Sequence, residues 1–308
     1  MKTSILPTGL LALGTALLLA GSAHAKVPGS NGRIVFDNDD GPVYTVEPDG
    51  SDLRLVTTGH DQAHYSSDGS RIAMDAGLDD EHVTTALMDA DGANLTIQPI
   101  PDPTGSIVCP IWEPGDAHLA CEFWDDAQPE RLPGIFTIHA SGWDFPTRLT
   151  TNTFGGHDIP GDYSPDGSRL AFWREDPARG MALFVLHLGS GELDRVSDWI
   201  RDTHTVSWSP DGRRLVYDDS RGNLVVSRAD GSRRHQITLQ VTGLRFAWEP
   251  TWSPDGKRIV FSLFTRRAGA GQLGIYTAKS DGSDVRAVAL ATEGAFSNAD
   301  WGPARPAE

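Results

Sequence analysis

The ten residues WSPDGRRLVY at positions 208–217 recur along the chain, and this repetition decides the fold. The phrase returns as WSPDGKRIVF at 252–261 and as YSPDGSRLAF at 163–172. More distant copies are YSSDGSRIAM at 65–74, WEPGDAHLAC at 112–121 and NGRIVF at 31–36. The last copy lacks the front half of the phrase. Six copies of one phrase predict a repeat protein.

The basic residue inside each copy gives the repeat period. Successive anchors lie 38 to 51 residues apart, at Arg33, Arg71, His118, Arg169, Arg214 and Arg258. This period is typical of a β-propeller in which each repeat forms one four-stranded blade. The chemistry agrees, because Pro-Asp-Gly favours a tight turn between two strands and the apolar stretch after the basic residue is strand-like.

The two ends of the chain carry complementary halves of a repeat. The first unit begins with its second strand at Asn31, and 296–303 resembles a first strand with nothing after it. A two-sheet sandwich would not explain these matching halves. We therefore predict an all-β, six-bladed propeller of antiparallel four-stranded blades, forming one domain over 26–308. The C-terminal strand joins the first blade, which removes two unpaired edges.

The repeat resembles a known family. The unit Trp-Ser-Pro-Asp-Gly-x-Arg-Ile/Leu-x-Phe, followed by Ile-Tyr-x-x-x-x-Asp-Gly as at 275–282, is similar to the propeller repeat of the TolB carboxy-terminal domain. The resemblance covers 31–303 and does not extend to the α/β domain that precedes the propeller in TolB. It implies an exported propeller that binds a protein or a ligand.

The first 25 residues have the pattern of a secretory signal peptide. Lys2 provides a basic start, an apolar run occupies 9–20, and Ala23-His24-Ala25 supplies a small-x-small cleavage pattern. The run is too short to cross roughly 30 Å of hydrocarbon. We expect cleavage after Ala25, export to the periplasm or beyond the cell, and no membrane insertion.

The charge of the chain limits its partners. The sequence has 42 Asp and Glu against 26 Lys and Arg, a formal net charge of −16. Contacts with nucleic acid and with anionic membranes need basic surfaces, so neither is expected. The partner favoured by this charge is a basic envelope or extracellular protein, and we expect a monomer.

Acidic residues begin five of the six loops between the second and third strands of the repeats. They are Asp37, Asp39 and Asp40, then Asp79, Asp80 and Glu81, then Asp125 and Asp126, then Glu175 and Asp176, then Asp218 and Asp219. The sixth loop carries Arg266 and Arg267. We interpret the acids as a solvated rim that maintains solubility, and the alternative is a surface that attracts basic partners or cations.

Common catalytic motifs are absent from the sequence. It contains no Gly-x-Ser-x-Gly, no His-Glu-x-x-His and no phosphate-binding Gly-x-x-x-x-Gly-Lys-Ser/Thr. The sequence therefore favours a binding or scaffold module without a resident cofactor over an enzyme.

The best candidate site lies where the first strands of the repeats enter the central channel. Its residues are His60, Asp61, Gln62, His157, Asp158, His204, Glu249 and Asn298. Each of the three histidines has an aspartate close in sequence, which suits metal ligation or proton transfer. A divalent cation held by these histidines would make the chain a metal-assisted lyase or hydrolase, which is the alternative function.

Cys109 and Cys121 are the only cysteines. They lie on two successive strands, nearly symmetrically about the turn at 113–116. Disulfides persist in exported proteins, so we favour a structural cross-strand bridge. The alternative is a pair of buried thiols acting as small hydrophobic groups.

Overall fold

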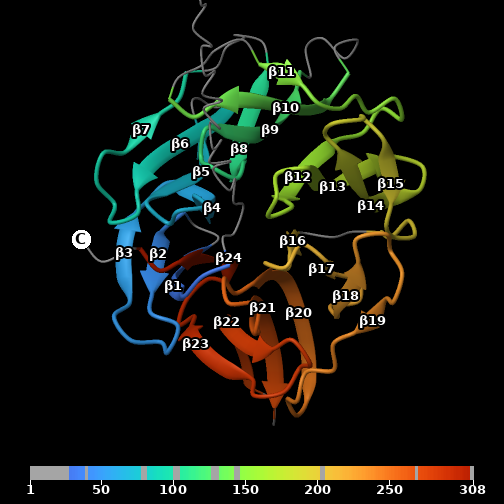
Figure 1. Ribbon diagram of the computed structural model, residues 1–308. Helices are drawn as coiled ribbons and strands as arrows, with labels where there is room; N and C mark the ends of the chain where they lie inside the picture. The colour runs from blue at the N-terminus through green and yellow to red at the C-terminus, as the bar shows by residue number, and fades with distance from the viewer. Residues whose placement is uncertain are drawn as a thin grey trace, which may run out of the picture.

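The computed structural model describes residues 28–38, 41–77, 82–99, 105–125, 132–141, 146–201, 205–267 and 270–305. These residues form strands and turns and no helix. Their strands build six four-stranded antiparallel sheets that stand as blades around a central axis (Figure 1). The predicted all-β, six-bladed propeller is confirmed. Within the described residues, no helix is long and apolar enough to cross a membrane.

The first three blades come from the N-terminal half and the last strand. Blade 1 consists of β24 (Phe296–Pro303), β1 (Asn31–Asn38), β2 (Val43–Val46) and β3 (Arg54–Thr57). Blade 2 consists of β4 (His60–Tyr65), β5 (Arg71–Gly77), β6 (Val83–Asp89) and β7 (Thr96–Ile97). Blade 3 consists of β8 (Ser106–Trp112), β9 (His118–Trp124), β10 (Gly134–His139) and β11 (Thr147–Arg148).

The remaining blades follow in chain order. Blade 4 consists of β12 (Asp158–Tyr163), β13 (Arg169–Asp176), β14 (Gly180–His187) and β15 (Leu193–Arg195). Blade 5 consists of β16 (Val206–Trp208), β17 (Arg214–Asp218), β18 (Leu224–Arg228) and β19 (His235–Gln236). Blade 6 consists of β20 (Leu244–Trp252), β21 (Arg258–Arg267), β22 (Ala270–Lys279) and β23 (Arg286–Leu290).

The C-terminal strand closes the ring as predicted. β24 pairs antiparallel with β1, with Ile34 opposite Trp301 and Asp37 opposite Ser297. In Figure 1 the dark red strand β24 lies beside the blue strand β1. Both ends of the domain therefore belong to one blade, and the first blade has no unpaired inner edge.

The aromatic residue that opens each phrase packs between two blades. Trp252 of blade 6 shares a buried cluster with Val216 and Leu224 of blade 5. Trp301 of blade 1 shares one with Val260 and Ile275 of blade 6. Each large ring lies between adjacent sheets, so the repeated aromatic provides apolar contact between neighbouring blades.

The arginine of the phrase reaches the next repeat. The guanidinium carbon of Arg169 lies 4.4 Å from the Trp208 ring centroid, and that of Arg214 lies 4.6 Å from Trp252. Arg169 also donates a hydrogen bond to the Gly212 carbonyl at 3.1 Å. These contacts combine cation–π attraction with capping of the following turn, which explains a basic residue at this position.

The aspartate of the phrase stabilises its own turn. Asp166 Oδ1 accepts hydrogen bonds from the Ser164 hydroxyl at 2.6 Å and the Ser168 N–H at 3.1 Å. Gly167 has φ of 67°, a conformation that glycine adopts readily. Partial burial alone would raise the pKa of Asp166, but its hydrogen bonds from Ser164 and Ser168 lower that pKa to about 2. The repeated Asp-Gly turns therefore have a structural role.

Candidate functional site

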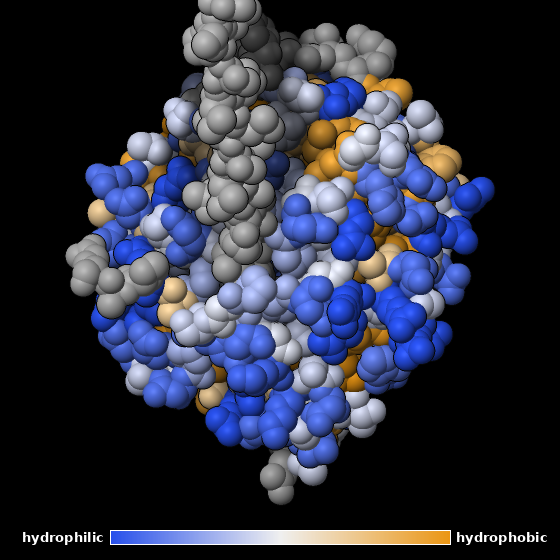
Figure 2. All heavy atoms as spheres, viewed as in Figure 1, coloured by the Kyte–Doolittle hydropathy of each residue, from blue (hydrophilic) through white to orange (hydrophobic). Residues whose placement is uncertain are grey.

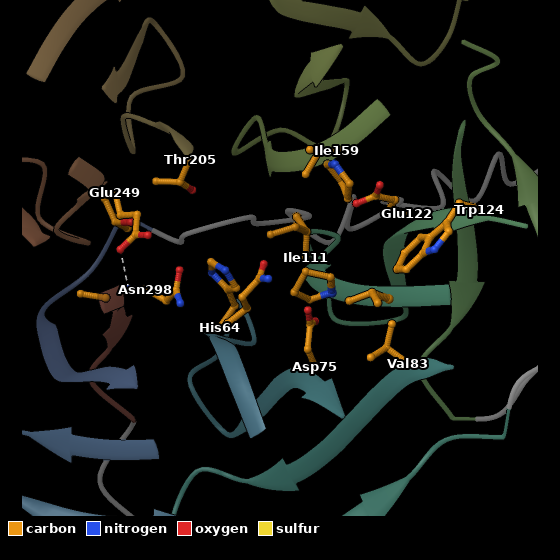
Figure 3. Close-up of a pocket in the computed structure, with 16 residues that line it drawn as sticks. His64, Asp75, Val83, Ile111, Glu122, Trp124, Ile159, Thr205, Glu249 and Asn298 are labelled. Atoms are coloured by element: carbon orange, nitrogen blue, oxygen red, sulfur yellow. Dashed lines mark hydrogen bonds between the residues drawn. The ribbon is translucent and has the colours of Figure 1, made fainter. Parts of the chain in front are cut away.

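A cavity of about 170 Å³ lies on the propeller axis, where the inner strands converge (Figure 3). Every blade contributes to its wall. From blade 1 to blade 6, the contributing residues include Asn298, Gln62, Glu122, Pro160, Thr205 and Glu249. The wall also includes Val83 at the start of β6 and Trp124 at the end of β9. The cavity therefore lies toward the loops that join the second and third strands of the blades.

β-Bulges shape the wall of this cavity. The pairing register shifts by one residue around Gln62 in β4, Glu249 in β20 and Asn298 in β24. These residues have φ values of 51°, 54° and 53°, in a region that non-glycine residues seldom occupy. A bulge releases a backbone group from the ladder of its own sheet and redirects the side chain. The three residues thus present both backbone and side chain to the axis.

Carboxylates of the preceding blade accept the released N–H groups. Asp37 Oδ2 on β1 lies 2.7 Å from the Gln62 nitrogen, and Glu249 Oε2 lies 2.6 Å from the Asn298 nitrogen. Asp218 Oδ1 on β17 accepts a longer bond of 3.4 Å from the Glu249 N–H. Each bond ties one blade to the next around the ring, so these acids belong to the scaffold of the site.

Asp37 is held by several donors at once. The Ser297 hydroxyl donates to Oδ1 at 2.9 Å, and the Asn298 side-chain amide contacts both carboxylate oxygens at 3.1 and 3.0 Å. Burial raises the pKa of Asp37 to about 6, although the hydrogen bonds from Asn298, Gln62 and Ser297 oppose this. Asp37 is therefore a structural acid whose charge changes just below neutral pH.

Asp75 on β5 occupies the same position in blade 2, four residues after the basic anchor. The N–H group that corresponds to that of Gln62 belongs to Cys109, and it donates instead to Thr85 Oγ1 on β6 at 2.7 Å. Asp75 Oδ1 is buried and receives no hydrogen bond from a described residue. The residue as a whole is half-buried, and it lines the cavity.

The electrostatic setting of Asp75 disfavours its charged form. Burial raises the pKa of Asp75 well above its ordinary value, and the nearby acids Asp61, Glu122 and Asp37 raise it further. Burial also raises the pKa of Asp61, against the opposing effect of His60. The blade 2 side of the cavity thus concentrates acidic groups.

Glu122 on β9 is the corresponding acid of blade 3, and it also lines the cavity. Its Oε1 atom lies 2.6 Å from His157 Nδ1, so a residue of the blade 3–blade 4 connection orients it. The His157 ring also makes an edge contact with Trp124, with centroids 6.0 Å apart. This pair fixes a carboxylate and an aromatic ring at one side of the cavity.

A second polar layer lies deeper along the axis. Asp300 Oδ2 accepts the Tyr65 N–H at 2.9 Å, and Asp162 Oδ2 accepts the Trp208 N–H at 2.7 Å. These acids line a smaller space of about 30 Å³, which is about the volume of one water. The channel therefore narrows below the main cavity.

The sequence-predicted site residues separate into two groups. Gln62, Glu249 and Asn298 line the cavity. His60, Asp61, His157 and Asp158 do not line it, although His157 binds the lining residue Glu122.

The contacts of Asp158 differ from what was expected of an aspartate that serves metal ligation or proton transfer beside His157. Its carboxylate is fully buried and forms a two-point ion pair with Arg174 on β13, at 2.7 and 2.6 Å, and Thr150 donates a third bond at 2.6 Å. This aspartate is satisfied inside blade 4 and does not orient His157 toward a ligand. The side-chain alternation of a strand explains the difference, because Asp158 points away from the axis.

The predicted three-histidine metal site includes His204, which lies outside the described residues. Among the described residues, no group of three or more His, Cys, Asp and Glu side chains lies together in a way that could hold a metal ion. The lyase or hydrolase alternative therefore remains a prediction from sequence.

The acidic rim requires a correction at four positions. Asp37, Asp125, Asp176 and Asp218 are at most 7% exposed, so these four side chains are not part of a solvated rim. Asp219 is bound within its own loop, where Oδ1 accepts the N–H groups of Arg221 and Asn223. Asp39, Asp40, Asp79, Asp80, Glu81 and Asp126 lie outside the described residues.

Sequence reasoning missed Asp75 and Glu122. Both stand four residues after the basic anchor of their repeats, a position filled in the six repeats by Asp37, Asp75, Glu122, Trp173, Asp218 and Ser262. Four acids at one repeat position are a detectable signal. It was obscured because Asp37 and Asp218 were grouped with the loops that follow them.

Cys109 and Cys121 are joined by a disulfide between β8 and β9. The register shift between Val108 and Ile111 brings the two residues opposite each other. Val108 and Pro110, the two neighbours of Cys109 in sequence, line the cavity. It ties together the two strands that carry the blade 3 part of the wall.

No protein-family model matches the chain. TolB from Acinetobacter baumannii has a similar structure, with a TM-score of 0.68 at 17% identity over 89% of this chain and 67% of that chain. A TolB-type protein from Agrobacterium tumefaciens gives 0.63 at 17% identity over 84% of this chain and 89% of that one. Hydrazine synthase from Kuenenia stuttgartiensis gives 0.67 at 13% identity over 89% and 47%.

These similarities concern the fold. The chain shares the six-bladed propeller of TolB-type proteins, as the sequence resemblance implied. A hydrazine synthase contains a similar structure, so the architecture by itself does not determine a function. Function must be argued from the cavity and its side chains.

Proposed function

We propose that this chain is an exported, soluble, TolB-like propeller that acts as a binding module, with a basic envelope or extracellular protein docking at the mouth of the central cavity. The observation that carries the proposal is the cavity itself. All six blades contribute to its wall, and three lining residues sit on bulges with positive φ. Strained, rigidly held positions of this kind are concentrated at functional sites.

The charge of the molecule supports a basic partner. The chain has a formal net charge of −16, and Asp75, Glu122 and Glu249 line the cavity. The face seen in Figure 2 is covered mainly by hydrophilic residues, with hydrophobic residues in scattered patches. Recognition by charge and by the cavity, rather than by a broad apolar surface, therefore fits the molecule best.

Site-specific photo-cross-linking tests this proposal. A photoreactive residue in place of Gln62 samples the cavity mouth, and one in place of Ser190 samples the exposed turn at the opposite end of blade 4. In the cells that produce the protein, we expect a discrete cross-linked product from position 62 alone. Its yield should fall as salt rises from 0.1 to 1 M, since the Debye length falls from about 10 to 3 Å. Identical products from both positions, or none from position 62, would contradict the proposal.

A further inference from the structure

One carboxyl group in the cavity is left unused by the scaffold. Asp37 is bound by three residues around it, whereas the N–H group in the matching place beside Asp75 is taken by Thr85. An unpaired carboxylate enclosed by protein is costly unless a cation or a proton neutralises it. The position therefore suits a ligand that brings positive charge.

A second carboxylate faces the same side of the cavity. Glu122 projects from the neighbouring blade into the same cavity (Figure 3), and its charge contributes to the raised pKa of Asp75. Its Oε1 is held by His157 at 2.6 Å, which fixes the side chain and leaves Oε2 for another donor. Two acids from adjacent blades thus bring negative charge to one cavity.

The walls around these two acids are apolar. Val83, Ile111 and Trp124 lie on this side of the cavity (Figure 3), and Pro110 also lines it. No Lys or Arg occurs among the described residues that line the cavity, and the basic side chain in this part of its wall is that of His64. Apolar walls beside carboxylates fit an aliphatic stem that ends in a charged group, and the Trp124 ring adds a favourable surface for a cation.

The size and the donor set favour an organic cation over a metal ion. The cavity of about 170 Å³ corresponds to about five or six waters at ~30 Å³ each, which is the scale of a four-carbon amine. The described residues provide no preformed cluster of three metal ligands. A primary ammonium group needs only hydrogen-bond acceptors, and it has three donors to share between them.

We propose that Asp75 and Glu122 bind the primary ammonium group of a short aliphatic amine, either a free amine or the Lys side chain of a docked partner. This inference rests on the proposed function, because it names the chemistry that the cavity recognises. The aliphatic part of the ligand lies against Val83, Pro110 and Ile111, and the ammonium group lies between the two carboxylates.

Calorimetric titration of the mature protein with n-butylamine tests the inference. We expect measurable binding of n-butylamine and none of n-butanol, which matches its shape without the charge. Asp75→Asn and Glu122→Gln should each weaken amine binding at least tenfold. Glu192→Gln, which removes one charge from an exposed turn at the far end of blade 4, should leave binding unchanged. The melting temperature of each variant establishes that it is folded.

Further titrations distinguish the two sources of the ammonium group and test whether metal ions compete with the amine. Binding of Nα-acetyl-lysine amide would identify a partner's Lys side chain as the ligand, and binding of n-butylamine alone would identify a free amine. Equal amine binding by wild type and Asp75→Asn would overturn the inference, as would tight binding of Ca²⁺ or Mn²⁺ that excludes the amine. If no amine binds while position 62 still gives its specific cross-link, this inference fails and the proposed function stands.

Discussion

Asp37 and Asp75 occupy the same repeat position in adjacent blades, yet their surroundings differ completely. Asp37 accepts hydrogen bonds from Gln62, Ser297 and Asn298 and is 1% exposed. Asp75 faces the cavity with a buried oxygen that no described residue binds. The same residue type therefore serves the scaffold in one blade and is available to a ligand in the next. The position within the repeat determines where a side chain lies. The hydrogen-bond donors around it determine whether it is bound by the scaffold.

Deleting residues 296–308 should cause the largest loss of stability, because it removes part of the surroundings of Asp37. The deletion removes β24, and with it two of the three residues that donate to Asp37, namely Ser297 and Asn298, and the buried ring of Trp301. Loss of a buried Trp alone costs about 3–5 kcal/mol, so we expect aggregation or a melting temperature lower by about 10 °C or more. Thermal unfolding of the truncated and full-length proteins measures this. An unchanged melting temperature would show that ring closure is not needed for stability.

Asp37→Ala should be the next most damaging change. It leaves the Gln62 N–H, the Ser297 hydroxyl and the Asn298 amide without their shared acceptor, which should reduce the free energy of unfolding by about 2–4 kcal/mol. Asp75→Ala removes no hydrogen bond from a described residue and should cost less than about 1 kcal/mol. Denaturant unfolding of both variants gives the two values. Equal losses would remove the distinction between the two acids.

Thr85→Val tests why Asp75 lacks a partner. The substitution removes the acceptor of the Cys109 N–H, so we expect a loss of about 1–2 kcal/mol. Thr85→Ser keeps the hydroxyl and provides the matched control. If both variants unfold at the same denaturant concentration, the bond to Thr85 does not determine where the Cys109 N–H points.

Asp75→Asn should change the pH dependence of stability more than stability itself. Burial raises the folded-state pKa of Asp75, so the unfolded chain releases this proton first as pH increases. In the wild type, the contribution of protonated Asp75 to the free energy of unfolding is fully present below about pH 4. It is lost as pH rises toward the folded-state pKa of this residue. Asn does not ionise, so the stability of the Asp75→Asn variant does not fall for this reason as pH rises. Its melting temperature relative to wild type should therefore be higher at pH 8 than at pH 4, and a constant difference would contradict the assignment.

The fold was predictable because its determinants are local and repeated. The Pro-Asp-Gly turns, the aromatic of each phrase and the missing front half at Asn31 specify six blades and their closure. Cys109 and Cys121 were expected to lie nearly symmetrically about the turn at 113–116, and the bulge after Val108 brings them opposite each other.

The site was less predictable because its contacts join different blades. Gln62, Glu249 and Asn298 were identified from their place at the start of the inner strands, and all three line the cavity. The bond from Cys109 to Thr85, which deprives Asp75 of a donor, depends on a bulge and on the packing of two sheets. Neither feature has a signal in the repeat phrase, so Asp75 could be aligned with Asp37 but not distinguished from it.

The protonation state of Asp75, followed by carboxyl ¹³C NMR, tests the central claim most directly. The account predicts that Asp75 is protonated well above the pH at which an ordinary aspartate ionises, and that n-butylamine drives its ionisation at constant pH. Asp37 should titrate near pH 6 with or without the amine, since its donors belong to the scaffold. An Asp75 signal that titrates near pH 4 and does not respond to the amine would contradict the account.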